Sequence, residues 1–190
     1  MRLIIGITGA SGVVMGYELL RALKGIEKIE THLVMTESAE RTFGYETELS
    51  PDEVRRAADA VYDAEDMGAA IASGSFRTEG MIVLPCSMKT LGGIVSGFSE
   101  NLLLRAVDVC LKEGRKVVLV PREMPLNRIH LKNLLEASEA GCSILPPVLT
   151  FYNRADTVEK QVQHIIGKIL MQFGVEYQPF VPWKDEPAIL

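Results

Sequence analysis

The stretch LIIGITGASGVV, residues 3–14, is the strongest indication of the fold class of this chain. An apolar run from Leu3 to Thr8 predicts a strand, and apolar residues at helical spacing from Val13 to Leu23 predict a helix. The two glycines and the serine between them form a tight turn, in which backbone N–H groups at a helix N-terminus can face a phosphate. The stretch therefore predicts a strand, a turn and a helix with an anionic ligand at the turn, rather than a plain connection.

The rest of the chain alternates predicted strands and helices. Strands are predicted at residues 31–35, 81–84, 117–120 and 143–145, and helices at 51–61, from 87 onward, and at 101–112, 127–140 and 156–173, the last capped by Asp156. Residues 36–49 are a polar stretch, and Ser50-Pro51-Asp52-Glu53 is a capping box with proline at the first helical position. The alternation predicts an α/β fold with a three-layer, doubly wound parallel sheet of the Rossmann or flavodoxin-like class.

Length and composition limit the alternatives. The 190 residues contain no repeat or linker, so we expect a single domain over residues 1–190. A net charge of -5 argues against a nucleic-acid-binding surface, and no apolar run is long enough for a signal peptide or a membrane span. The 3 cysteines form no C-x-x-C pair, which favours a reducing cytoplasm. The 47% hydrophobic content suggests contacts within an oligomer.

Two further polar clusters follow predicted strands, at the sheet edge where ligands bind in open α/β folds. The segment Pro85-Cys86-Ser87-Met88-Lys89-Thr90 offers hydroxyls and free backbone N–H groups. Pro121-Arg122-Glu123-Met124-Pro125 places a guanidinium beside a carboxylate, for which a structural Arg–Glu pair is the alternative. Cys86 is interpreted as a small buried residue, because nothing near it in the sequence supplies a base.

A dinucleotide-binding oxidoreductase is the runner-up class. Glu37 follows the second strand, where such proteins place a carboxylate for a ribose hydroxyl. Against this reading, the glycine spacing is G-x-x-G-x-x-G rather than G-x-G-x-x-G. In addition, no tyrosine is followed four residues later by lysine, as in short-chain dehydrogenases.

The three clusters also resemble a known family. Together with Ser73-Gly74-Ser75, Asn101-Leu102-Leu103-Leu104-Arg105-Ala106 and Phe151-Tyr152, they resemble the UbiX-type flavin prenyltransferases, which include a component of phenolic acid decarboxylases. The resemblance covers nearly the whole chain. It implies transfer of a dimethylallyl group from dimethylallyl (mono)phosphate to N5 and C6 of reduced FMN, without a metal. It also implies a homododecamer and a UbiD-type decarboxylase that receives the product.

The resemblance extends to single residues. It places at the flavin Gly9, Ala10, Ser11, Thr36, Ser87, Met88, Lys89, Thr90 and Arg122, and at the donor phosphate Arg105, Lys112, Tyr152 and Lys168. It assigns acid–base chemistry to Glu123, a second active-site carboxylate to Glu46 and a phosphate contact to Ser11. Trp183 corresponds to an aromatic residue in a tail, residues 174–190, that closes the site.

Cations at the donor phosphate agree with the chemistry of the reaction, because cations and a phenol can stabilise the negative charge of the departing phosphate without Mg²⁺. Judged without the family, Arg105 and Lys112 would be surface residues on one face of a helix. Many members of the family have arginine at the position of Lys168. Lysine lacks the planar guanidinium that binds two phosphate oxygens at once.

Two other flavin proteins remain as alternatives, an FMN-containing decarboxylase and a non-catalytic FMN carrier. Cysteine decarboxylases of this fold use a histidine beside the flavin and a P-x-M-N-x-x-M-W segment, and neither is found here at the expected place. We interpret His32, His130 and His164 as structural. The hypothesis of a non-catalytic FMN carrier does not explain why Glu123 stands beside Arg122, nor why the additional cations are present.

Overall fold

The computed structural model describes residues 1–183. The chain divides between Pro146 and Pro147 into two compact units, which are described one at a time. The prediction of a single domain, with residues 174–190 as a tail closing the site, stays a prediction, and residues 184–190 lie outside the described part. No helix within residues 1–183 is long and apolar enough to cross a membrane.

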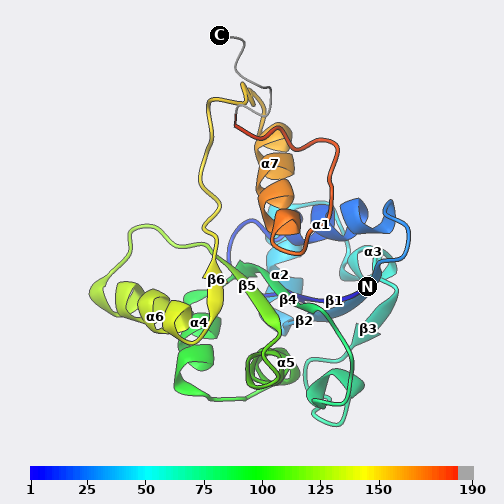
Figure 1. Ribbon diagram of the computed structural model, residues 1–190, viewed down its shortest axis with the longest axis vertical. Helices are drawn as coiled ribbons and strands as arrows, with labels where there is room; N and C mark the ends of the chain where they lie inside the picture. Colours follow the sequence, from blue (N-terminus) through cyan, green and yellow to red (C-terminus); the bar gives the residue numbers. More distant parts are fainter. Residues whose placement is uncertain (184–190) are drawn as a thin grey trace. The chain divides into compact units, whose positions relative to one another are not determined.

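A six-stranded parallel sheet forms the centre of the first unit (Figure 1). Its strands are β1 (Arg2–Ile7), β2 (Glu30–Met35), β3 (Ala60–Tyr62), β4 (Gly80–Cys86), β5 (Lys116–Pro121) and β6 (Cys142–Ile144). Their order is β3-β2-β1-β4-β5-β6, so the direction of winding reverses between β1 and β4. Ligands of doubly wound sheets bind at this reversal, outside the carboxyl ends of the strands. The predicted fold class is confirmed.

Helices cover both faces of this sheet. They are α1 (Val14–Lys24), α2 (Glu37–Glu46), α3 (Pro51–Arg56), α4 (Met88–Ser96), α5 (Leu102–Lys112) and α6 (Arg128–Glu139), with a short 3-10 turn at Ala70–Ala72. A side chain at Gly6 would meet Leu103 of α5, whereas the side chain of its neighbour Ile7 contacts Gly16 of α1. Adjacent strand residues point to opposite faces, so α1 and α5 lie on opposite sides of the sheet.

Helix α2 lies in the stretch that the sequence indicated only as polar. Its N-cap is Thr36, whose side-chain oxygen accepts a hydrogen bond from the backbone N–H of Ala39 at 3.2 Å. Ala39 and Phe43, four residues apart, are its buried residues. With so narrow an apolar stripe, the helical period is weak in the sequence.

The predicted helix at 51–61 is wrong in its second half. Helix α3 ends at Arg56, and Ala60–Tyr62 pairs with β2 as the edge strand β3. The carboxylate of Asp59 accepts hydrogen bonds from the backbone N–H and the hydroxyl of Thr31, both at 2.8 Å. This contact with β2 places Ala60–Tyr62 along the edge of the sheet. A local helical pattern in the sequence does not reveal such a contact.

The second unit contains α7 (Val158–Met171). Its N-cap is Thr157 rather than the predicted Asp156, and the Thr157 side chain accepts from the backbone N–H of Lys160 at 3.2 Å. A Cβ atom on Gly167 would lie 2.3 Å from the ring of Phe180, so the glycine lets this ring rest directly on the helix. The segment after α7 is therefore packed against it through Phe180.

Candidate active site

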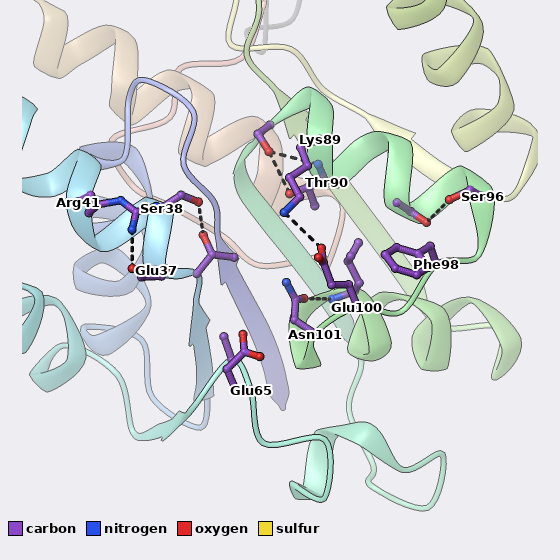
Figure 2. Close-up of a pocket in the computed structure, with 15 residues that line it drawn as sticks. Glu37, Ser38, Arg41, Glu65, Lys89, Thr90, Ser96, Phe98, Glu100 and Asn101 are labelled. Atoms are coloured by element: carbon purple, nitrogen blue, oxygen red, sulfur yellow. Dashed lines mark hydrogen bonds and ion pairs between the residues drawn. The ribbon is translucent and has the colours of Figure 1, made fainter.

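A cavity of 480 Å³ lies at the carboxyl ends of the strands in the first unit (Figure 2). Residues from α2, α4 and α5 line it, together with residues from the two segments that precede α5 and follow β3. Among the residues expected at the flavin, it brings together Thr36, Ser87, Lys89 and Thr90. Its volume is in the range of small-molecule sites, and its position is the one that the winding of the sheet favours.

Two helices begin at this cavity. Thr36 caps α2, and Ser87 caps α4 by accepting from the backbone N–H of Thr90 at 3.2 Å. The hydroxyls of Ser87 and Thr90 lie 3.0 Å apart. The N-terminus of a helix carries partial positive charge and free N–H groups, so the cavity suits an anionic group such as a phosphate.

The ends of neighbouring strands are tied together beside the cavity. The hydroxyl of Thr8, which is buried, donates to the carbonyl of Pro85 and accepts from the backbone N–H of Ser87, both at 2.8 Å. The backbone N–H of Arg122 donates to the carbonyl of Cys86 at 3.2 Å. The three clusters that the sequence indicated separately therefore meet at one edge of the sheet.

The glycine turn after β1 lies against α2. A Cβ atom on Gly9 would be 2.6 Å from the side chain of Ser38, which leaves no room for any larger residue. The backbone N–H of Gly12 donates to the carboxylate of Glu46 at 2.8 Å. Ser11, between these glycines, is exposed. Glu46 thus reaches the turn that carries Ser11, and both belong to the residues expected to act in the reaction.

The cavity lining contains both signs of charge. Figure 2 shows Lys89 and Glu100 pointing toward each other, and their charged groups lie 3.2 Å apart. The Lys89 side chain is 83% exposed, so this pair is weak and can open for a ligand. The carboxylate of Glu37, which a dinucleotide site would use for a ribose, forms an ion pair with Arg41 instead.

Arg122 and Glu123 are both exposed at the end of β5. The Glu123 carboxylate accepts from the backbone N–H of Met124 at 3.1 Å. Within residues 1–183, no ion pair joins Arg122 and Glu123, so the alternative of a structural Arg–Glu pair is not observed. Both side chains are therefore available to a ligand.

The remaining flavin residues lie in the same region without lining the cavity. Ala10 is buried in the glycine turn and Met88 is half-buried at the start of α4.

Two of the expected phosphate ligands lie away from the cavity lining. Arg105 donates from Nε to the carbonyl of Ala72 at 3.2 Å and pairs with Asp108. Lys112, near the other end of α5, pairs with Glu113. Their assignment to the donor phosphate stays a prediction.

The other two expected phosphate ligands, and the tryptophan, belong to the second unit. The ring of Tyr152 lies edge-on to Trp183 with centroids 5.0 Å apart, and edge-on to His164 at 5.6 Å. The ammonium of Lys168 lies 5.9 Å from the centre of the Phe180 ring. This unit therefore gathers a phenol, a cation and three aromatic rings around α7.

The cysteines take no part in this arrangement. Cys86, Cys110 and Cys142 are free and buried. Burial raises the pKa of Cys110 and of Cys142 to about 11, and raises the pKa of Cys86 further. All three are neutral thiols near pH 7, which confirms the interpretation of Cys86 as a buried residue. No group of three metal-binding side chains occurs within residues 1–183.

Sequence reasoning foresaw only part of what α2 and the segment before α5 contribute. The cavity residues not foreseen there include Ser38, Arg41 and Phe98. The available signals were a threonine N-cap followed by two glutamates in the first turn of α2, and the asparagine N-cap of α5.

Comparison with known proteins gives one consistent answer. The family described as Flavoprotein matches residues 1–174. A probable UbiX-like flavin prenyltransferase from Sedimentibacter hydroxybenzoicus is 60% identical over 184 residues, which is 97% of each chain. A UbiX protein solved in complex with FMN and dimethylallyl pyrophosphate has a TM-score of 0.94 at 46% identity and covers 98% of both chains. A dodecameric FMN-dependent UbiX-like decarboxylase from Escherichia coli O157:H7 has a TM-score of 0.95 at 50% identity, over 96% of this chain and 99% of that one.

Proposed function

Because the chain belongs to the flavoprotein family and is a flavin prenyltransferase of the UbiX type, we propose that its substrates are reduced FMN and dimethylallyl monophosphate. The cavity at which Thr36 and Ser87 cap two helices is the observation that supports this most directly. Reduced FMN supplies the nucleophilic N5 and C6 positions. The protein supplies binding, orientation and proton transfer.

The flavin site combines helix N-termini with hydroxyl groups. Thr36, Ser87 and Thr90 present hydroxyls at the cavity, and the N–H groups of α2 and α4 favour the FMN phosphate or other oxygen-rich parts of the molecule. The exposed guanidinium of Arg122 provides a cation at the rim. Gly9 lets the glycine turn lie directly against α2, because a Cβ atom there would be 2.6 Å from the Ser38 side chain.

We assign proton transfer to the carboxylate of Glu123, with Glu46 as a second carboxylate in the site. Glu123, exposed at the end of β5, takes the proton that leaves C6 when the fourth ring closes. Glu46 holds the glycine turn through Gly12 and supports Ser11 at the donor phosphate. Trp183 offers a π-face to the allylic group as positive charge develops on it.

The donor phosphate departs with its negative charge stabilised by cations and a phenol. We assign this role to Tyr152 and Lys168, and to Arg105 and Lys112. Since Arg105 and Lys112 do not line the cavity of their own chain, we infer that they act in the site of a neighbouring subunit. This requires assembly, and a dodecamer like that of the E. coli relative is the form we propose.

The proposed product, a prenylated flavin, is a cofactor that a second enzyme must receive. We propose a UbiD-type decarboxylase as its recipient. A reducing compartment, the cytoplasm, suits the three free cysteines.

Mass spectrometry of the released flavin tests the proposal. After anaerobic incubation with reduced FMN and dimethylallyl monophosphate, the flavin should gain one prenyl unit, and a chelator should not prevent this. A parallel reaction with the diphosphate tests the donor preference. Unchanged FMN would support a carrier, and unchanged FMN with release of CO₂ from an aromatic acid would support a decarboxylase. Preferential binding of NAD over FMN would contradict the flavin site itself.

A further inference from the structure

An imidazole lies at the centre of the aromatic cluster on α7. His164 is 4% exposed, and its ring lies 5.6 Å from the ring of Tyr152 and 5.0 Å from that of Phe180. Phe180 reaches this position because Gly167, one turn along the helix, has no side chain. The imidazole is therefore enclosed by rings rather than by water.

The two nitrogens of His164 have different surroundings. Nε2 lies 3.4 Å from the phenol oxygen of Tyr152, whereas Nδ1 is buried and has no hydrogen-bond partner among residues 1–183. A buried N–H without an acceptor is rarer and more costly than a buried lone pair without a donor. The proton of the neutral ring therefore belongs on Nε2, directed at Tyr152, and Nδ1 carries the lone pair.

The charged form of His164 is disfavoured here. Burial, and secondly the positive charge of Lys168, lower the pKa of His164. A second ring proton would also leave an unpaired N–H at Nδ1. Near pH 7 the imidazole is neutral, and its single N–H points at the phenol.

This orientation determines what the phenol can do. A tyrosine oxygen that accepts a hydrogen bond keeps its own O–H for another acceptor. The Tyr152 side chain is partly open, with the residue 42% exposed. Lys168 lies one turn after His164 on the same helix, and its ammonium forms no ion pair with a carboxylate of residues 1–183. A phenol O–H and an ammonium that no carboxylate of residues 1–183 neutralises are both groups that bind the oxygens of a phosphate ester.

We propose that His164 is a positioning residue, whose neutral imidazole donates Nε2–H to Tyr152 and thereby directs the phenol O–H at the phosphate of the prenyl donor. The inference rests on the proposed function, in which Tyr152 and Lys168 hold that phosphate. It adds a residue that does not touch the donor but determines the direction of the hydrogen bond.

Steady-state kinetics with dimethylallyl monophosphate test the proposal. His164→Leu should lower kcat/KM for the donor roughly tenfold, the effect of losing one hydrogen bond to a charged group, while FMN affinity stays unchanged. His164→Gln can place an amide N–H near the position of Nε2, so it should recover most of the loss. Gln163→Leu, which removes a polar side chain from the adjacent position of α7, is the control and should leave kcat/KM unchanged.

A double-mutant cycle separates positioning from packing. In a Tyr152→Phe background, which has no phenol, His164→Leu should have no further effect on kcat/KM. If the tenfold loss persists in that background, His164 acts through packing and the proposal is overturned.

The tautomer gives a readout that does not depend on activity. Nitrogen NMR of labelled histidine should show the His164 proton on Nε2 in the wild type, and a proton on Nδ1 would overturn the proposal. If wild-type protein does not prenylate FMN, the proposed function has failed, and the NMR result then decides alone whether His164 orients Tyr152.

Discussion

Arg122 and Glu123 are adjacent at the end of β5, yet their charges do not neutralise each other. Glu123 uses one carboxylate oxygen to accept from the backbone N–H of Met124 at 3.1 Å. The hydrogen bond orients the carboxylate, and both residues are exposed. An exposed carboxylate held by the backbone has the chemistry that we propose for the base acting on a bound flavin.

We predict that Glu123→Gln slows the formation of cyclised flavin by about 10²- to 10⁴-fold, because the amide retains the hydrogen bond but accepts no proton. FMN affinity should stay nearly constant. An alkylated flavin whose fourth ring is still open should accumulate, detectable by its absorption spectrum. Glu139→Gln, at an exposed carboxylate near the end of α6, serves as the control. Cyclisation at the wild-type rate in Glu123→Gln would show that another group is the base.

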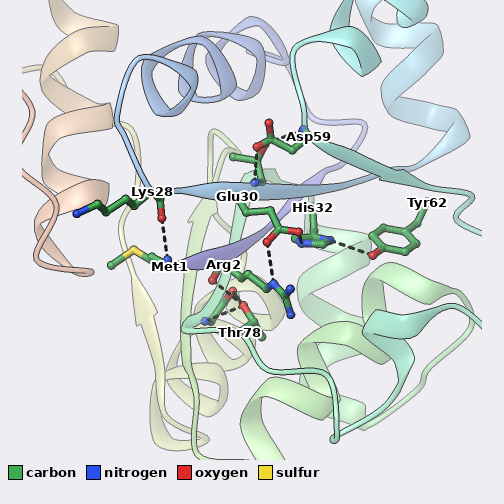
Figure 3. Close-up of polar contacts among 10 residues, drawn as sticks. Met1, Arg2, Lys28, Glu30, His32, Asp59, Tyr62 and Thr78 are labelled. Atoms are coloured by element: carbon green, nitrogen blue, oxygen red, sulfur yellow. Dashed lines mark hydrogen bonds and ion pairs between the residues drawn. The ribbon is translucent and has the colours of Figure 1, made fainter.

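His32 illustrates the opposite situation, a titratable group buried for structural reasons (Figure 3). It is 4% exposed in β2, with Nδ1 at 2.9 Å from the Tyr62 hydroxyl and Nε2 at 3.1 Å from the Glu30 carboxylate. The ring of Phe76 packs edge-on at 4.9 Å. Burial lowers the pKa of His32, and the negative charges of Glu30 and of Asp59 oppose this only in part.

This pKa shift predicts how stability depends on pH. Since the folded state prefers neutral His32, its contribution is complete above the unfolded-state pKa of 6.5 and is lost as pH falls through the lower folded-state pKa. The free energy of unfolding, measured with urea, should therefore decrease between about pH 7 and about pH 5. His32→Gln should make this decrease smaller. An identical slope in the variant would show that other groups are responsible.

At the scale of elements, helix ends and close helix contacts position the site. Helices α2 and α4 begin at the cavity because Thr36 and Ser87 satisfy their first free N–H groups. In the second unit, α7 holds Phe180 because Gly167 lets the ring approach to where a Cβ atom would be only 2.3 Å away. One small residue thus determines which rings surround His164.

We predict that Gly167→Ala displaces Phe180 and loosens the aromatic cluster, although alanine favours a helix by roughly 1 kcal/mol over glycine. The expected result is a lower melting temperature and a changed Trp183 fluorescence, because the Trp183 ring belongs to the same cluster. Gly44→Ala is the matched control, since nothing lies within 4 Å of a Cβ there in α2. A Gly167→Ala protein at least as stable as Gly44→Ala would contradict this account.

At the scale of the whole molecule, α6 exposes an apolar surface. Ile129, Leu131 and Leu135 are 68%, 53% and 60% exposed. Leu131 and Leu135, four residues apart, share one face of α6, and exposed apolar side chains of this kind favour burial in an interface. A second copy of the chain is the partner consistent with a dodecameric relative at 50% identity.

We predict that light scattering gives a mass twelve times the chain mass of 20.9 kDa. Ile129→Glu should reduce the mass, because a buried charge without a partner destabilises the interface. Ser138→Glu adds the same charge to an exposed polar position of α6 and should leave the assembly intact. A wild-type monomer would contradict both the assembly and the role inferred for Arg105 and Lys112 in a neighbouring site.

The doubly wound sheet, and the sheet edge at which a ligand is expected, could be predicted from local sequence patterns alone. Hydrophobic period, glycine turns and helix caps are local properties, so LIIGITGASGVV and the clusters after β4 and β5 could be interpreted residue by residue. The capping box that begins at Ser50 was recognisable for the same reason, and the structure confirms it.

Features that depend on partners far apart in the chain could not be predicted from local patterns. Strand β3 exists because Asp59 bonds Thr31, 28 positions earlier in the chain, and a three-residue edge strand has little pattern of its own. The hydrogen bond between Gly12 and Glu46 and the approach of Phe180 to Gly167 likewise join separate segments. Nδ1 of His164 has no hydrogen-bond partner among residues 1–183 because the surrounding rings bury it, and this burial exists only once those rings are packed in three dimensions.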